Sequence, residues 1–150
     1  DKPHSCPPVA RSILIPLAGL QHRMLKTPMI GTDIIDKRRI AALWRTHGQR
    51  LAEKILHPDE LAQLSAQRDP VRYLAMRWAA KEALGKALGT GLRAPLIMPA
   101  IRLDKTVLGA PQFADTEPLH GLRCARDIAT IHLSLSDERD YAVAFVWCER

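Results

Sequence analysis

The sequence predicts an α+β protein whose strands run antiparallel. Helical segments lie between strand-like segments, and the chain finishes with two alternating apolar segments, 128–135 and 141–147, joined by the polar turn 136–140. A short polar turn between two such segments is typical of a β-hairpin. At 150 residues, with 47% hydrophobic and 25% charged residues, the chain has the size and composition of one globular domain.

Residues 1–28 differ from the rest of the chain, because they carry five prolines and no sustained periodicity. We expect an N-terminal extension of unknown role at 1–28 and the domain proper at 29–150. The apolar run 13–20 is broken by Pro16 and Gly19 and is too short to span a bilayer. The three widely spaced cysteines form no CxxC metal-binding pair, and we expect a cytoplasmic location without membrane contact.

The first half of the domain predicts one strand followed by short helices. The strand is expected at 29–35, and Asp36 then caps a helix that ends near Gly48. A second helix is expected at 49–56. A third begins around Pro58, with an irregular start because His57 is a poor capping residue.

A long helix is the strongest prediction in the chain. Asp69-Pro70 is a capping acid followed by proline, and no helix-breaking residue follows before Gly85. Beyond a proline-containing loop at 93–99, the sequence predicts a strand near 101–104, a turn at 109–111 and a helix near 117–126.

Charged residues interrupt the apolar surface of this long helix. Eleven residues make about three helical turns, so Glu82 lies only ~20° from Val71 and continues an apolar stripe. Lys86 follows one turn later, so one reading is a structural Glu82–Lys86 ion pair on a partly exposed surface. Arg77 and Lys81 carry like charges one turn apart, which is unfavourable unless they hold an anion such as phosphate.

A second carboxylate and a polar strand face add to the interpretation that these charges bind a phosphate. Asp33 follows Gly31-Thr32 and, with Glu82, offers the hard oxygen ligands that Mg²⁺ takes beside water and phosphate. In the segment 131–137, alternation places His132 and Ser134 on one polar face. Taken alone, Asp33 also fits a turn former, and the polar strand face also fits a solvent-facing sheet edge.

Positive charge is concentrated on the first helices. The whole chain carries a net charge of +6. Within 37–54 only Glu53 opposes six basic residues: Lys37, Arg38, Arg39, Arg45, Arg50 and Lys54. This basic patch is either a solvated helix face or a surface for an anionic partner.

In this order, the motifs GTDIIDKRRI, RWAAKEALGKALGTG, GAP and HLSLSDERDYAVAFV resemble those of holo-acyl-carrier-protein synthases, the small bacterial type of 4′-phosphopantetheinyl transferase. The resemblance covers roughly residues 29–150, and its central Lys-Glu-Ala-x-x-Lys block is the most specific part. It implies the 4′-phosphopantetheinyl transferase fold, with an antiparallel sheet packed on a long central helix.

The resemblance also implies an activity and its residues. Such enzymes move phosphopantetheine from coenzyme A to a serine of apo acyl carrier protein, and release adenosine 3′,5′-bisphosphate. By motif position, the implied roles are Mg²⁺ ligands for Asp33 and Glu82, a contact with the coenzyme A phosphates for Lys86, and a place bordering coenzyme A for His132, with Ser134 beside it. The remaining phosphates suit Arg77, Lys81, Gly89 and Gly91. Because acyl carrier proteins are acidic, docking suits Arg38, Arg39 and Arg45. Either Glu82 or a metal-bound water accepts the serine proton. A homotrimer with active sites between subunits is implied as well.

Two other functions compete with this one. A basic nucleic-acid-binding module would interleave aromatic residues with its Lys and Arg, but Trp44 and Trp78 fall on apolar helix stripes, so we expect no nucleic acid partner. A non-catalytic scaffold that binds carrier proteins is the other alternative. The presence of Asp33, Glu82, Lys86 and His132 argues against it.

Overall fold

The computed structural model describes residues 29–150, so the extension expected at 1–28 lies outside the described part of the chain. In chain order the elements are β1 (Met29–Asp36), α1 (Lys37–His47), α2 (Gln49–Ile55), α3 (Pro58–Ala62), the 3₁₀ turn η1 (Leu64–Ala66), α4 (Pro70–Ala87), the 3₁₀ turn η2 (Met98–Ala100), β2 (Leu103–Lys105), β3 (Pro111–Phe113), α5 (Glu117–Ala125), β4 (Thr130–Asp137) and β5 (Tyr141–Glu149). The predicted α+β class with an antiparallel sheet is confirmed.

Three long strands form the main sheet, in the order β1-β5-β4 and antiparallel throughout. The expected terminal hairpin is β4–β5. Its alternation gives the sheet two faces: Ala144 and Val146 of β5 are buried on the inner face, whereas Phe145 and Trp147 are 45% and 44% exposed on the outer face. β1 and β4 are therefore the two edges of a sheet with one covered face.

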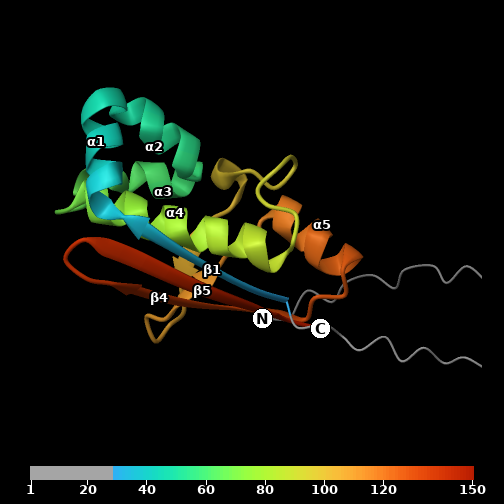
Figure 1. Cartoon of the computed structure of the whole chain (residues 1–150). Coiled ribbons are helices and arrows are strands. Elements are labelled where there is room, and N and C mark those ends of the chain that lie inside the picture. The colour runs from blue at the N-terminus through green and yellow to red at the C-terminus, as the bar shows by residue number, and fades with distance from the viewer. Residues whose placement is uncertain (1–28) are drawn as a thin grey trace, which may run out of the picture.

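The long helix α4 covers the inner face of the sheet (Figure 1). Its start is the predicted one, because the Asp69 side chain accepts a hydrogen bond from the Arg72 backbone N–H at 2.9 Å and Pro70 is the first helical residue. β1 lies directly on this helix: a Cβ at Gly31 would collide with the carbonyl oxygen of Ala83 and the amide nitrogen of Ala87. This close approach sets β1 against the second half of α4.

The shorter helices pack around the ends of α4, with α1, α2 and α3 at its start and α5 near its end (Figure 1). Asp36 caps α1 as predicted, accepting from the Arg38 N–H at 2.8 Å. The predicted irregular start of α3 is wrong. The His57 Nδ1 accepts from the Asp59 N–H at 3.2 Å, and the Glu60 carboxylate accepts from the His57 N–H at 2.9 Å, so the helix begins with a reciprocal capping box.

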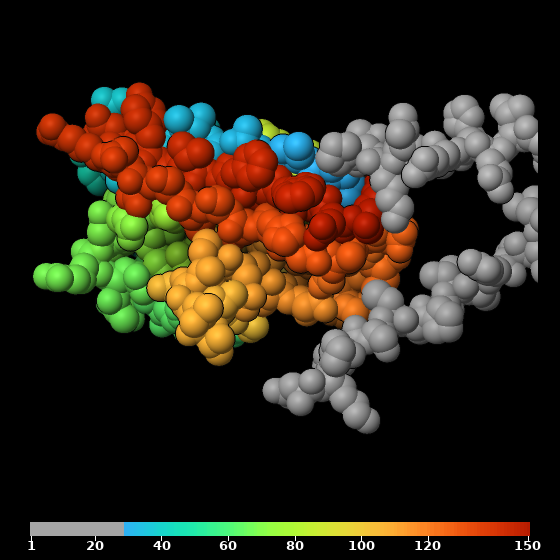
Figure 2. Space-filling view, turned by 90° about the horizontal axis from the view of Figure 1, so that it is seen from below, coloured from blue at the N-terminus to red at the C-terminus, as the bar shows by residue number. Residues whose placement is uncertain are grey.

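The small hairpin β2–β3 packs beside β4 and away from β1. Figure 2 shows it in orange, between the red strands of the main sheet and the green start of α4. Within residues 29–150 no helix is long and apolar enough to cross a membrane.

Candidate active site

Asp33, Glu82 and Lys86 meet at the β1 edge of the molecule. The Lys86 Nζ donates to Asp33 Oδ1 at 2.8 Å and to the Thr32 carbonyl at 2.9 Å. The Lys86 side chain is 53% exposed and that of Asp33 is 14% exposed, so the pair opens to solvent on one side. The lysine therefore pairs with a carboxylate from β1, instead of the Glu82 ion pair that helix spacing alone allows.

The Glu82 side chain is half-buried, and together with Asp33 it forms the acidic group of the site. Burial raises the pKa of Glu82, and the neighbouring Asp33 carboxylate raises it further, whereas Lys86 opposes the shift. Two carboxylates that influence one another in this way form a local excess of negative charge. A cation bound between them would relieve it.

The donor set fits Mg²⁺ better than a softer metal. Among the described residues 29–150, no three His, Cys, Asp or Glu side chains are grouped closely enough to hold a metal ion. A metal here would therefore rest on Asp33 and Glu82 and take its other ligands from water or substrate. Mg²⁺ commonly binds in this manner, through one or two carboxylates and phosphate oxygens.

The basic face of α1 lies beside this group. The Arg39 guanidinium sits 5.9 Å from the centre of the Trp78 ring, and Trp78 is one turn before Glu82 on α4. Arg38 is exposed but engaged, because its guanidinium donates to both oxygens of Asp36, which lowers the pKa of that carboxyl. Arg45 is exposed in the last turn of α1.

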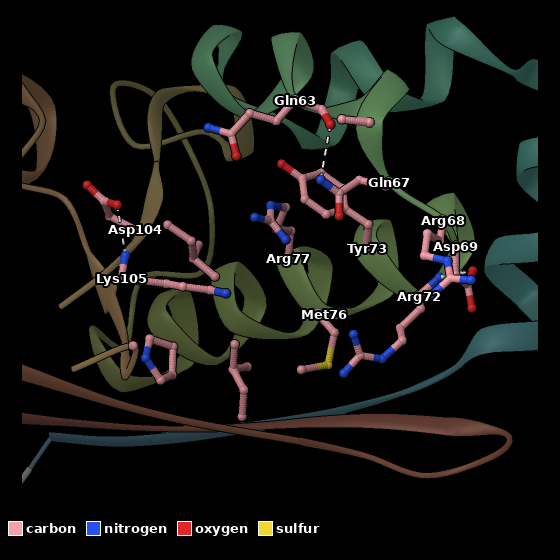
Figure 3. A pocket seen from close by; sticks show the side chains of 15 residues that line it. Gln63, Gln67, Arg68, Asp69, Arg72, Tyr73, Met76, Arg77, Asp104 and Lys105 are labelled. Atoms are coloured by element: carbon pink, nitrogen blue, oxygen red, sulfur yellow. Dashed lines mark hydrogen bonds between the residues drawn. The ribbon is translucent and has the colours of Figure 1, made fainter. Parts of the chain in front are cut away.

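A cavity of about 730 Å³ opens on the other side of α4, walled by the α3–η1 segment, by α4 and by the β2–β3 hairpin. Four basic side chains line it: Arg68, Arg72, Arg77 and Lys105. Figure 3 shows Arg77 from α4 and Lys105 from β2 directed into the same space. The Arg77 guanidinium stacks on the Tyr73 ring, 3.4 Å from its centroid. Asp69 and Asp104 also line the cavity, so the four basic side chains leave its wall with a positive balance that suits an anion.

The structure corrects the role expected for Lys81. This side chain is fully buried, and its Nζ donates to Glu60 Oε2 at 2.6 Å and to the Ile55 carbonyl at 2.7 Å. Burial lowers the pKa of Lys81 to about 8, against the opposing effect of Glu60. Lys81 is a core residue that is not available to a phosphate in solution.

Glycines follow α4 as expected. Gly89 and Gly91 have φ angles of 67° and 63°, a region that favours glycine, and a Cβ at either would meet open space. The Gly91 N–H closes the end of α4 by donating to the Gly85 carbonyl at 3.1 Å. The resulting turn lies immediately beyond Lys86.

His132 and Ser134 are not brought to the acidic group. Both are exposed on the outer face of β4, whereas Asp33 and Glu82 lie on the side of the sheet that α4 covers. The His132 Nε2 lies 3.1 Å from Glu149 Oε2, and its ring is 5.5 Å from that of Trp147. Arg77 is also separate from the acidic group. It precedes Glu82 by five residues on α4, so the two side chains point about 140° apart around the helix axis.

Two charged residues that contact the cavity lining, Glu60 and Asp137, were not identified from the sequence. Glu60 lies in the first turn of α3 and is 1% exposed. Asp137 accepts two hydrogen bonds from Arg72, at 2.8 and 2.7 Å, and one from Lys37 at 3.2 Å. These contacts join residues far apart in the chain, and no local spacing signals them.

Comparisons with known proteins agree with the motifs. The sequence profile of the 4′-phosphopantetheinyl transferase superfamily matches residues 29–146. Holo-acyl-carrier-protein synthase of Laribacter hongkongensis is 46% identical over 117 residues, which are 78% of this chain and 94% of that protein.

Solved structures give the same result. Holo-acyl-carrier-protein synthase from Neisseria meningitidis matches with a TM-score of 0.77 and 41% identity, covering 81% of this chain and 97% of that one. The Helicobacter pylori enzyme, solved in complex with coenzyme A, matches with a TM-score of 0.70 and 26% identity, covering 81% of this chain and 100% of that one.

Fold and site thus define a small α+β transferase with an acidic group and a basic cavity on opposite sides of its central helix. The chain belongs to the 4′-phosphopantetheinyl transferase superfamily, within which its relatives are holo-acyl-carrier-protein synthases.

Proposed function

We propose that this protein transfers 4′-phosphopantetheine from coenzyme A to a serine of an apo acyl carrier protein, requires Mg²⁺, and releases adenosine 3′,5′-bisphosphate. The observation that carries the proposal is the meeting of Asp33, Glu82 and Lys86 at the β1 edge. It gains support from the coenzyme A complex of the Helicobacter pylori relative.

In this reaction the serine oxygen forms a bond to the phosphorus of the phosphopantetheine arm, and the pyrophosphate P–O bond breaks. Asp33 and Glu82 are the residues that would hold Mg²⁺, which would supply positive charge to offset the negative charge of the phosphates. Lys86, exposed next to Asp33, is placed to offset the charge that grows on the leaving phosphate. The two carboxylates would bind the metal ion, and Lys86 would offset the negative charge of the leaving group.

The cavity suits the nucleotide end of the donor. Arg77 is held over the Tyr73 ring and accompanied by Arg68, Arg72 and Lys105, so the cavity concentrates positive charge where the 3′-phosphate would bind. Gly89 and Gly91 leave room for a phosphate to approach the backbone near Lys86.

A homotrimer would unite these separated groups. Asp33, Glu82 and Lys86 lie at the β1 edge, whereas the cavity and the His132–Ser134 face belong to the β4 side of the same chain. In a closed ring, the β1 side of one subunit contacts the β4 side of the next. Exposed apolar residues on the outer sheet face supply the surface for such contacts: Ile30, Ile34, Phe145 and Trp147.

The carrier protein would dock on α1. Acyl carrier proteins are acidic, and Arg38, Arg39 and Arg45 give this helix an exposed positive face. Arg39, whose guanidinium lies 5.9 Å from the centre of the Trp78 ring one turn before Glu82, links this face to the acidic group. A serine delivered across α1 would thus arrive near Asp33.

The test is a transfer reaction with apo acyl carrier protein, coenzyme A and Mg²⁺, with and without a chelator, followed by intact mass of the carrier. We expect a gain of one phosphopantetheinyl group that the chelator abolishes. No gain with several carriers, while the protein remains folded, would contradict the proposal and favour a carrier-binding scaffold.

A further inference from the structure

Glu60 touches all three walls of the basic cavity although it does not line it. Its Oε2 accepts from the His57 N–H in the capping box of α3 and from Lys81 Nζ in α4, at 2.9 and 2.6 Å. Its Oε1 accepts from the Leu103 N–H at the start of β2, at 2.9 Å, and lies 3.4 Å from the Arg77 Nε. One carboxylate therefore ties together the α3–η1 segment, α4 and the β2–β3 hairpin.

This arrangement exceeds what a helix cap requires. A capping Glu in the first turn of a short helix can perform that role at the surface, whereas burying its charge is costly unless partners compensate. The Glu60 side chain is 2% exposed and the Arg77 side chain 19%, and the Arg77 Nε is buried without a hydrogen-bond partner among the described residues. The Glu60 charge is the closest acidic compensation for that buried nitrogen.

We propose that Glu60 is a positioning residue for donor recognition, which holds Arg77 and the β2–β3 hairpin so that the cavity accepts a phosphorylated nucleotide. This inference rests on the proposed function, because it assumes that the cavity binds the 3′-phosphate end of coenzyme A. It assigns Glu60 no contact with the reacting atoms. Its effect passes through the direction of the Arg77 guanidinium and through the hairpin wall that carries Lys105.

The variant Glu60→Gln keeps the shape of the side chain and removes its charge. With coenzyme A as donor we expect KM to rise roughly tenfold while kcat stays within about twofold, the pattern of lost binding shared by ground and transition states. With coenzyme A lacking its 3′-phosphate, KM should change by less than about twofold, because the group that Arg77 would contact is missing. A residue that only stabilises the fold would alter neither donor preference nor this KM-against-kcat split.

Leu119→Ala is the matched control, since Leu119 is a buried residue of α5 and lies outside the cavity. It should lower Tm without changing the preference between the two donors. If Glu60→Gln does not fold, Glu60→Asp retains the charge for Lys81 but shortens the reach to Arg77, and it should show the same loss of preference.

The double variant Glu60→Gln with Arg77→Lys decides whether the effect passes through Arg77. Donor preference in the double variant should equal that of Arg77→Lys alone. Unchanged donor preference in both Glu60 variants, beside a wild type that prefers coenzyme A, would overturn the inference and leave the transfer activity standing. A wild type that binds neither donor would overturn the proposed function itself.

Discussion

The Lys81 Nζ lies 2.6 Å from Glu60 Oε2, and both side chains are almost fully withdrawn from solvent. Glu60 belongs to α3 and Lys81 to the middle of α4, so the pair joins the small helical cluster to the long helix. Burial costs both charges their hydration, and the pair is stable in the core because each charge compensates the other.

Breaking this pair from one side should destabilise the protein strongly. Lys81→Met leaves the Glu60 carboxylate buried without its ammonium partner, which we expect to cost about 3–5 kcal/mol of unfolding free energy. The double variant Lys81→Met with Glu60→Gln removes both charges of the pair, so neither is left buried without the other, and it should recover part of that loss. Urea unfolding of the three proteins measures this, and a loss below about 1 kcal/mol for Lys81→Met would show that the pair is dispensable.

Lys81 and Glu82 show where prediction from the sequence succeeds and where it fails. The capping acid and the uninterrupted run to Gly85 predict α4 correctly, because these signals are local. The helical periodicity of α4 also shows that charged residues fall among its apolar positions. It places Glu82 on the apolar stripe, but the fully buried charge is Lys81, because Glu60 and the Ile55 carbonyl reach that position from elsewhere in the chain.

The same limit applies to the acidic group. The sequence motifs pair Asp33 with Glu82, but they leave open whether Lys86 pairs with Glu82 or with an anion. The structure supplies Asp33 as that partner because Gly31 lets β1 lie on the backbone of α4. A contact between residues separated by more than fifty positions depends on tertiary packing, which local spacing does not encode.

Gly31 should tolerate no side chain. In Gly31→Ala the added methyl group meets backbone atoms of Ala83 and Ala87, which cannot rotate away, so β1 must shift off α4. We expect a loss of at least about 1–3 kcal/mol, the usual range for overpacking. Gly121→Ala is the control, because a Cβ there meets open space within α5 and alanine favours a helix by about 0.5–1 kcal/mol. Equal thermal stability of the two variants would contradict this account of the β1–α4 contact.

Lys86 should matter for turnover and little for folding. Its side chain is 53% exposed, and an ion pair at that exposure contributes at most about 1 kcal/mol. In Lys86→Met we expect kcat to fall by about 10²–10³, the usual loss when one stabilising group for transition-state charge is removed. Steady-state transfer kinetics beside a melting curve checks both parts. A variant that keeps wild-type kcat would exclude Lys86 from the leaving-group role.

Glu82 offers a test in which two neighbours act in opposite directions. Its pKa is raised by burial and by Asp33 and is lowered by Lys86, so Asp33→Asn should move the pKa down and Lys86→Met should move it up. Carboxyl ¹³C NMR titration of the metal-free protein measures both shifts. Shifts of the same sign in the two variants would contradict the arrangement of the three groups.

The raised pKa of Glu82 also sets the sign of a pH dependence for metal binding. Mg²⁺ requires the ionised carboxylate, and protons compete for Glu82 at a higher pH than for an ordinary Glu, whose pKa is near 4.3. Affinity for Mg²⁺ should therefore weaken as the pH falls through the pKa of Glu82 and level off above it. Calorimetric titration with Mg²⁺ across this range checks the trend, and a flat profile would argue against Glu82 as a ligand.

Subunit complementation tests how the separated groups form one site. Glu82 faces β1, whereas Arg77, about 140° away around α4, opens into the cavity on the β4 side. In the proposed ring assembly the two residues would meet from different subunits. Glu82→Gln and Arg77→Ala should each be impaired alone. Trimers refolded from a mixture contain interfaces with intact Glu82 and intact Arg77, and these should regain activity. A mixture of Glu82→Gln with Asp33→Asn should not, because both residues belong to the same group in one chain. Failure of the first mixture to exceed its components would assign both sides of α4 to a site within one subunit.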